Sequence, residues 1–297
     1  MTALSSYEGQ VRFDAYHNTE ESVRVDNIRA TFERGYLRFN ELMNTAPGGV
    51  VSIVGSGPSL ARTYKDIVGD VIACNSAHDF LIERGIIPKF ALYWDANPII
   101  AKFASKPHVG VTYLVASRCH PDLFKALAGH RVIVFHALTG EPVEQFLVAN
   151  NRMEPMIGGG AAGVTRGTHI AGAMGYTDMH LFGVDSSYEE DATHVGGSII
   201  DQQKIRLKVC GKAFITAPWM ALQVMDFKAI GPHLQSMGVK VTIHGTGMLP
   251  YAASFMEGVA TPDIKVTRLD KVYRALSSLI VLFLEIRGNN KYADLVT

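Results

Sequence analysis

A series of short apolar runs, each followed by a polar or glycine-rich turn and then by a segment of helical character, constrains the fold most strongly. The runs occupy residues 50–54, 71–74, 90–94, 112–116, 132–136, 180–184 and 240–244. Runs this short, without polar alternation, are typical of strands that are buried on both faces of a sheet. Because helical segments separate them, we expect a mostly parallel α/β sheet with helices on both faces.

Longer helical patterns flank this series and divide the chain into three parts. Residues 19–43 predict an N-terminal helix that Thr19 caps, with Glu20 and Glu21 in its first turn. Residues 271–286 predict an amphipathic C-terminal helix, whose apolar face favours self-association into a homo-oligomer. The sequence therefore predicts an N-terminal helical segment (1–46), a Rossmann-like domain (47–250) and a C-terminal helical extension (251–297).

Composition argues against several kinds of partner and site. The chain has 28 Lys and Arg against 28 Asp and Glu, so its net charge gives no general reason to bind nucleic acid. Its three cysteines, Cys74, Cys119 and Cys210, are far apart and form no CxxC, which argues against a disulfide framework or a zinc site. The N-terminus has no signal-peptide pattern, and the longest apolar run, 279–284, is too short to span a bilayer. We therefore expect a soluble, cytoplasmic protein.

The first candidate site is the turn after run 50–54, which consists of Gly55, Ser56, Gly57, Pro58 and Ser59. Glycine lets the backbone approach a ligand closely, and proline presets the first turn of a following helix. Free N–H groups at such a helix start can hold a phosphate. The turn matches neither a Walker loop nor a GxGxxG fingerprint, so a tight turn without a ligand is the equally weighted alternative.

Two further runs end in a polar side chain. Asn75 follows run 71–74 and can offer both a donor and an acceptor to a base or a ribose, although asparagine often only caps the next helix. Asp95 follows run 90–94, where a carboxylate suits a metal or a hydroxyl group, or simply forms a turn. Ligands bind at the carboxyl ends of parallel strands, so we expect both residues near the first turn.

A glycine run, Gly158, Gly159 and Gly160, precedes a predicted helix over residues 162–174. Such a run either forms a second cradle for an anion or allows close packing of the backbone against the first glycine-rich turn. The density of glycine favours the anion cradle over the packing interpretation.

The segment after run 180–184 contains the two candidate catalytic residues, Asp185, which closes the run, and His194, which lies in a polar loop beyond it. Ser186 and Tyr188, which follow Asp185, are candidate nucleotide-binding residues. A loop histidine near a strand-end carboxylate can act as a general base at neutral pH. The alternative is that His194 is an ordinary surface residue without a catalytic role. The acidic residues 189–191 are more typical of a solvated loop than of a metal site.

Taken in order, these segments resemble the MptE-like superfamily over about residues 47–250. That group unites archaeal 6-hydroxymethyl-dihydropterin pyrophosphokinases, Maf flagellin glycosyltransferases and, more distantly, bacterial sialyltransferases with the motif Gly-Asn-Gly-Pro-Ser-Leu. Similar proteins occur in bacteriophage genomes, so the resemblance includes phage-encoded members. The matching features are the turn at residues 55–60, the Cys74–Asn75 strand end, Asp95, the glycine run with its helix, the segment 175–188 and His194.

The resemblance implies roles for these residues. By similarity to the sialyltransferases, Gly55, Ser56, Gly57, Ser59 and Asn75 would hold the nucleotide of a donor, and His194 would be the catalytic base. The sequence departs from the sialyltransferase pattern in two places. Ser56 replaces the sialyltransferase asparagine, and the glycine run replaces Arg-x-Thr-Ser-Gly. In the pyrophosphokinases the same loops would hold ATP and a pterin, with Mg²⁺ on carboxylates that match Asp95 and Asp185.

Three functions follow from this reading. The favoured one is a glycosyltransferase that uses a CMP-, UDP- or GDP-linked sugar, with His194 as general base. The second is a pyrophosphokinase that needs Mg²⁺ and ATP. The third is a non-catalytic binding or assembly protein that retains the fold. The acceptor is undetermined among a sugar, a protein, a lipid-linked glycan and modified DNA.

Overall fold

The computed structural model describes residues 19–140, 142–150, 154–160, 162–190, 192–195, 204–267, 270 and 283–285. Within them a ten-stranded sheet forms the centre of the molecule, and every pairing in it is parallel. Its strands are β1 (Leu37–Arg38), β2 (Val50–Val54), β3 (Asp70–Cys74), β4 (Phe90–Tyr93), β5 (Thr112–Ala116), β6 (Arg131–Ala137), β7 (Met156–Ile157), β8 (Asp178–Phe182), β11 (Lys240–Ile243) and β12 (Val259–Ala260). The predicted α/β class and parallel sheet are confirmed.

The strand order places the functional edge of the sheet. The order is β1-β6-β5-β4-β3-β2-β8-β11-β12, with β7 paired to β6. The chain steps outward from β2 to β6 and then returns to place β8 on the other side of β2. In such sheets the crevice beyond the carboxyl ends of the two strands at this switch point is the usual ligand site. Here the two strands at the switch point are β2 and β8.

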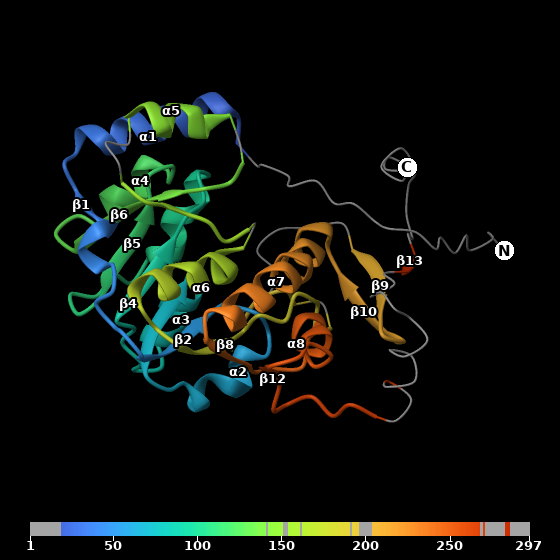
Figure 1. Ribbon diagram of the computed structural model, residues 1–297. Coiled ribbons are helices and arrows are strands. Elements are labelled where there is room, and N and C mark those ends of the chain that lie inside the picture. Colours follow the sequence, from blue (N-terminus) through green and yellow to red (C-terminus); the bar gives the residue numbers. More distant parts are fainter. Residues whose placement is uncertain are drawn as a thin grey trace.

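Helices cover both faces of the sheet (Figure 1). On one face α6 packs on β2, β3, β4 and β8, with α7 beside it, and on the other the short α2 and α3 cover Val54, Ala73 and Phe182. The α-helices are α1 (Glu21–Glu33), α2 (Leu60–Thr63), α3 (Ala77–Ile82), α4 (Pro121–Ala126), α5 (Val143–Asn150), α6 (Gly163–Met174), α7 (Pro218–Ser236) and α8 (Met248–Ala253). The 3-10 helices are η1 (Phe39–Leu42), η2 (Tyr64–Asp66) and η3 (Pro98–Ala104).

A small antiparallel sheet of β10 (Lys212–Thr216), β9 (Ile205–Val209) and β13 (Phe283–Glu285) lies beside α7 and α8 (Figure 1). The β9–β10 hairpin turns at Cys210 and Gly211, which both have positive φ. This is the conformation of a tight primed turn, which matches the twist of the two strands. Strand β10 also contacts the main domain, because Tyr188 donates its amide N–H to the carbonyl of Ile215 (2.8 Å).

The flanking segments differ from the prediction. The helix expected over residues 19–43 ends at Glu33, because Gly35 has a φ of 64° and residues 37–38 pair with β6 as a strand. Its N-cap is Glu20 without a side-chain hydrogen bond, so Thr19 is not the cap. The predicted C-terminal helix is wrong at residues 283–285, which form β13 against β9. Residues 271–282 and 286, the rest of that helix, lie outside the described residues.

None of the described helices is long and apolar enough to cross a membrane.

Candidate functional site

The turn after β2 and the segment that ends β8 lie in direct contact, and this contact is called the crossing of β2 and β8 below. Gly55 donates its N–H to the carbonyl of Phe182, and Gly57 donates to that of Gly183, both at 2.8 Å. A Cβ on Gly55 would lie 2.6 Å from the Gly183 oxygen, and one on Gly57 would lie 2.7 Å from it. Only glycine fits at these two positions. The two strand ends that the sequence predicted to meet are therefore brought together, and glycine permits their close approach.

Asp185 joins the same crossing from the β8 side. Its Oδ2 accepts hydrogen bonds from the amide N–H and the hydroxyl of Ser59, both at 2.9 Å. The residue is only 5% exposed, and Gly57, Gly245 and Gly247 pack directly against it. Burial raises the pKa of Asp185 above its ordinary value, although both hydrogen bonds from Ser59 oppose that shift. The Asp185 carboxylate thus accepts the Ser59 N–H, one of the donors in the turn that the sequence analysis expected to bind a phosphate.

Asn75 is held in an unusual backbone conformation at the end of β3. Its φ is 51°, in the left-handed region, where its own N–H donates to Leu92 and its carbonyl accepts from His78. Its side-chain Oδ1 is sealed from solvent and has no hydrogen-bond partner among the described residues. Strained conformations and unsatisfied polar atoms of this kind concentrate at functional sites.

The first turn of α6 lies between these two loops. A Cβ on Gly163 would lie 3.6 Å from Nδ2 of Asn75, and the Val164 side chain reaches the Gly55 backbone on the other side, at 2.7 Å from a Cβ built there. The N-cap residue of α6, Ala162, makes no side-chain cap. The first N–H groups of a helix have no partner within it, and the helix dipole makes that end attractive to anions. The α6 start therefore brings open donors to the edge of the sheet.

The glycine run before α6 surrounds an arginine. The buried guanidinium of Arg166 donates to the carbonyls of Ile157 (2.6 Å), Gly158 (3.0 Å) and Gly160 (2.8 Å). A Cβ on Gly159 would collide with the Arg166 backbone, and one on Gly160 would collide with Asp226 of α7. These glycines allow close packing, against α6 and α7 rather than against the first glycine-rich turn. Their carbonyl groups face a cation.

Trp94 and Asp95 directly follow β4 at the same edge of the sheet. The Trp94 ring lies within 4.6 Å of the Arg166 guanidinium carbon and within 5.5 Å of that of Arg118. Oδ1 of Asp95 accepts the amide N–H of Asn97 (2.9 Å), as in the turn that the sequence offered as an alternative. Sequence reasoning missed both arginines. Arg118 lies two residues after the end of β5, so a search for polar residues after each predicted strand could have found it.

His194 is brought to the crossing of β2 and β8 by its loop. The next residue, Val195, donates its N–H to the carbonyl of Ser56 at 2.8 Å. Nδ1 of His194 hydrogen-bonds the Thr193 hydroxyl (2.7 Å), and the imidazole stacks on the Trp219 indole with 6.3 Å between ring centroids. Burial lowers the pKa of His194 below its ordinary 6.5, so the ring is neutral at pH 7. A neutral imidazole is the form that can accept a proton.

Ser186 and Tyr188 face the small sheet and α7. Ser186 has a φ of 51°, and its hydroxyl donates to Oε1 of Gln223 (2.9 Å). Its carbonyl accepts from the hydroxyl of Thr216 (2.9 Å). The contributions of Thr216, Trp219 and Gln223 were missed from the sequence. The alternating pattern of residues 205–209 and 212–216 would have predicted the hairpin that carries the first of them.

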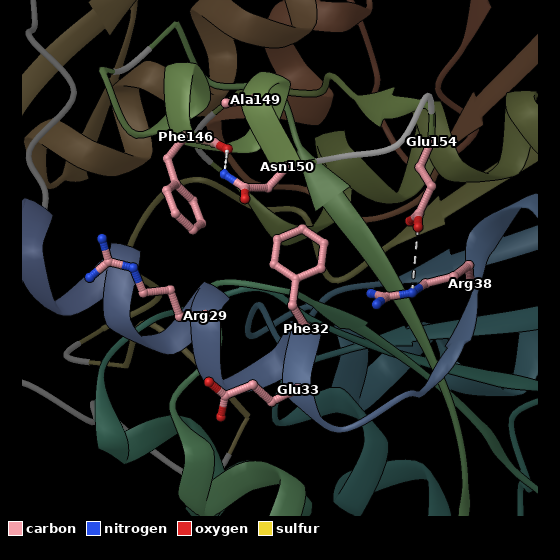
Figure 2. A pocket seen from close by; sticks show the side chains of 8 residues that line it. All are labelled: Arg29, Phe32, Glu33, Arg38, Phe146, Ala149, Asn150 and Glu154. Carbon is pink, nitrogen blue, oxygen red and sulfur yellow. Dashed lines mark hydrogen bonds and ion pairs between the residues drawn. The ribbon is translucent and has the colours of Figure 1, made fainter.

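A separate cavity of about 470 Å³ lies between α1 and α5, beside the β6 end of the sheet (Figure 2). Figure 2 shows Phe32 and Phe146 between Arg29 on one side and the Arg38–Glu154 ion pair (3.5 Å) on the other. Behind that pair, Glu154 also lies 3.1 Å from Nε2 of buried His136, whose pKa burial lowers to about 4. None of the predicted site residues lines this cavity. Three strands, β5, β4 and β3, separate β6 from β2, so the cavity is distinct from the crossing of β2 and β8.

Within the described part of the chain, no cluster of three or more His, Cys, Asp or Glu side chains could hold a metal ion. Asp185 accepts two hydrogen bonds from Ser59 and is enclosed by glycines, so in this conformation its carboxylate does not fit the role of a Mg²⁺ ligand. Asp95 is half-buried at the end of β4, and its Oδ1 already accepts the Asn97 N–H.

Comparisons with known proteins agree with this architecture. The family described as 6-hydroxymethylpterin diphosphokinase MptE-like matches residues 25–191. A Maf glycosyltransferase from Magnetospirillum magneticum AMB-1 has a similar structure, with a TM-score of 0.60 and 17% identity over 88% of this chain and 42% of its own. This chain thus spans less than half of that protein.

A second solved structure is more distant. The sialyltransferase CstII from Campylobacter jejuni, in complex with the substrate analogue cytidine-5'-monophosphate, has a TM-score of 0.39 and 16% identity over 83% of this chain and 92% of its own. No curated protein sequence matched. Because the family match covers more than half of the 297 residues, the chain belongs to the MptE-like family.

Proposed function

We propose that this protein transfers a sugar from a nucleotide-activated donor to an acceptor hydroxyl. The observation that carries the proposal is the uncapped start of α6, which lies between the Gly55 turn and Asn75 at the switch point of the sheet. His194 lies in a loop tied to the same turn. The fold shared with a Maf glycosyltransferase is consistent with this chemistry.

In this proposal the donor phosphate binds the first-turn amides of α6 rather than those of the Gly55 turn. The amides of Gly55, Gly57 and Ser59 already donate to Phe182, Gly183 and Asp185. Helix α6 has twelve residues, so its dipole is well developed at that end. Asn75 adjoins the α6 start and has an unsatisfied Oδ1, which a ribose hydroxyl or a base amino group would satisfy after a small side-chain movement.

His194 supplies the base. Its Nε2 takes the proton of the acceptor hydroxyl while the acceptor oxygen bonds to the anomeric carbon of the sugar. The bond from that carbon to the phosphate oxygen breaks, and the nucleotide leaves with the electron pair. The dipole of α6 stabilises the negative charge that forms on the leaving phosphate. Because burial lowers the pKa of His194, the base is in its neutral form at physiological pH.

A diphosphokinase is the second candidate, because the matching family carries that description. This reaction would need Mg²⁺ to bridge the phosphates of ATP. Asp95 is the better-placed carboxylate, since Asp185 would have to release both hydrogen bonds from Ser59 to coordinate a metal. We rank the kinase second because the Asp185 carboxylate already accepts both hydrogen bonds from Ser59.

Ligand-dependent thermal stability separates the two candidates. We expect CMP, UDP or GDP, or a sugar-linked form of one of them, to stabilise the protein without Mg²⁺. Saturation at a hundred times the dissociation constant adds about 2.7 kcal/mol. Stabilisation by ATP only in the presence of Mg²⁺ would favour the kinase. Indifference to all these nucleotides would favour a non-catalytic role for the fold.

Hydrolysis or transfer of the stabilising nucleotide sugar then tests the base. His194→Asn should lower kcat by about 10²–10⁴-fold, because a general base contributes that much. His233→Asn, a substitution of an exposed histidine far along α7, is the matched control and should leave kcat unchanged. Equal activity in the two variants would remove His194 from the mechanism.

A further inference from the structure

Trp219 stacks on the imidazole of the proposed base. It is the second residue of α7, directly after Pro218, which begins the helix. The indole and the His194 ring are nearly parallel, with 16° between their planes and 6.3 Å between their centroids. This is the offset arrangement that aromatic pairs prefer. One of the chain's two tryptophans therefore covers the histidine that the proposed function requires.

The start of α7 is anchored to the site loop by neighbouring contacts. Thr216, three residues before Trp219, donates to the Ser186 carbonyl (2.9 Å), and Gln223, one turn after it, accepts from the Ser186 hydroxyl (2.9 Å). Residues four apart on a helix share a face, so Trp219 and Gln223 face the same loop. The indole is thus presented from a fixed element to the more irregular loop that carries His194.

The two ring nitrogens of His194 differ in their hydrogen bonds. Nδ1 bonds the Thr193 hydroxyl (2.7 Å), whereas Nε2 makes no hydrogen bond to any described residue. When Nδ1–H donates to Thr193, the lone pair is on Nε2 and is available to an acceptor hydroxyl. A ring that turned over about its Cβ–Cγ bond would lose the Thr193 contact but keep its plane, so Thr193 fixes which nitrogen faces outward and Trp219 fixes the plane of the ring.

We propose that Trp219 is a positioning residue that, together with Thr193, holds the His194 imidazole with Nδ1 protonated and Nε2 facing the acceptor. This inference rests on the proposed glycosyl transfer for its catalytic meaning. The stacked indole also keeps water from one face of the imidazole. Charged groups of neighbouring segments include Arg62 with its partner Glu189 (2.8 Å), and Asp185, Glu190 and Lys204. Burial accounts for the low pKa of His194.

Nitrogen-15 NMR of histidine-labelled full-length protein tests the proposal without any substrate. In the wild type we expect His194 to show the Nδ1–H tautomer and to titrate below its ordinary pKa. Trp219→Ala should raise the pKa of His194 towards 6.5 and mix the tautomers. Trp219→Phe keeps a stacking ring and should resemble the wild type. Unchanged His233 signals show that α7 is intact in each variant.

Identical tautomer and titration of His194 in the wild type and in Trp219→Ala would overturn the proposal. With an active donor, Trp219→Ala should also lower kcat by about ten- to a hundredfold at nearly constant KM for the donor, and Trp219→Phe should restore most of it. If the NMR changes occur but no nucleotide sugar reacts, the positioning stands and the glycosyl-transfer proposal fails. The two failures are therefore distinguishable.

Discussion

The two glycine-rich loops of this protein look alike in sequence but are organised around opposite charges. In the turn at residues 55–59, N–H groups point inward, and a carboxylate, Asp185, accepts the N–H of Ser59. In the run at residues 158–160, carbonyl groups point inward, and the guanidinium of Arg166 donates to two of them. The first loop therefore presents the polarity that an anion needs, and the second presents the polarity that a cation needs.

The difference shows that glycine density alone does not identify a phosphate site. Neighbouring atoms leave no room for a Cβ at Gly55 and Gly57 of the first loop or at Gly159 and Gly160 of the second. The inward-facing groups are also already paired: N–H groups of the first loop donate to the carbonyls of Phe182 and Gly183 and to the carboxylate of Asp185, and carbonyls of the second loop accept from the Arg166 guanidinium. The remaining candidate donors are the first N–H groups of α6, which begins just after the second glycine run and whose N-cap residue makes no side-chain hydrogen bond. We infer that the loops are scaffolds that position α6 and Asn75.

Removing the cation from the second loop should have the largest effect. Arg166→Met leaves three carbonyl groups without their donor in a buried place, and we expect a loss of about 3–5 kcal/mol of unfolding free energy. Arg29→Met, at an arginine whose side chain is 58% exposed, should change it by less than about 0.5 kcal/mol. Urea unfolding measures both. A small loss in Arg166→Met would show that the loop does not depend on its guanidinium.

Adding a methyl group to the first loop should have the next largest effect. Gly57→Ala places a Cβ 2.7 Å from the Gly183 oxygen and against Asp185, which should cost about 1–3 kcal/mol. Gly172→Ala lies within helix α6 with only ordinary contacts, and should stabilise by roughly 0.5–1 kcal/mol. Thermal unfolding of the pair compares them directly. Equal stability would mean that the crossing of β2 and β8 is looser than the structure indicates.

Neutralising the carboxylate of the first loop should have a smaller, pH-dependent effect. Burial raises the pKa of Asp185 above 3.8, so its contribution to stability is greatest at low pH and falls as pH rises through the folded-state pKa. Asp185→Asn removes this titration and should cost no more than about 1 kcal/mol at pH 7. Relative to the variant, the wild type should lose stability from pH 4 to pH 8 in urea unfolding. The opposite slope would mean that the Ser59 hydrogen bonds outweigh burial.

At Asn75, which follows β3, we expect the smallest effect on stability and a specific effect on nucleotide binding. Asn75→Gly relieves a left-handed backbone and should change stability by less than about 1 kcal/mol. Asn44→Gly is matched to it, because Asn44 has a φ of 55° and is exposed far from the site. Thermal shifts with the stabilising nucleotide should decrease only in Asn75→Gly. An equal decrease in both, or in neither, would separate Asn75 from the nucleotide.

The sequence predicted the central sheet well because its strands are buried runs with clear ends. Residues 50–54 and 112–116 form strands with the predicted bounds. Strand β8 ends two residues earlier than predicted, since Gly183 adopts a φ of 59° and gives its carbonyl to Gly57. The C-terminal segment misled because a short apolar run fits a strand as well as a helix, and residues 283–285 find a partner in β9.

The candidate site was predictable in its location but not in its pairing. Strand ends of a parallel sheet meet at one edge, so the grouping of the Gly55 turn with Asp185 followed from the strand pattern. That Asp185 would occupy the amide of Ser59 depends on tertiary contacts with three glycines, which no local pattern encodes. Trp219 and Gln223 come from a helix more than thirty residues after Asp185 along the chain, so strand-end reasoning could not include them.

A crystal structure of the protein soaked with CMP, UDP and GDP tests the central claim most directly. The account predicts a nucleotide whose phosphate accepts hydrogen bonds from the amides of Gly163 and Val164, with its base or ribose against Asn75 and the Gly158–Gly160 carbonyls uninvolved. A nucleotide bound in the cavity between α1 and α5, or an α6 start that stays closed to all three, would contradict it.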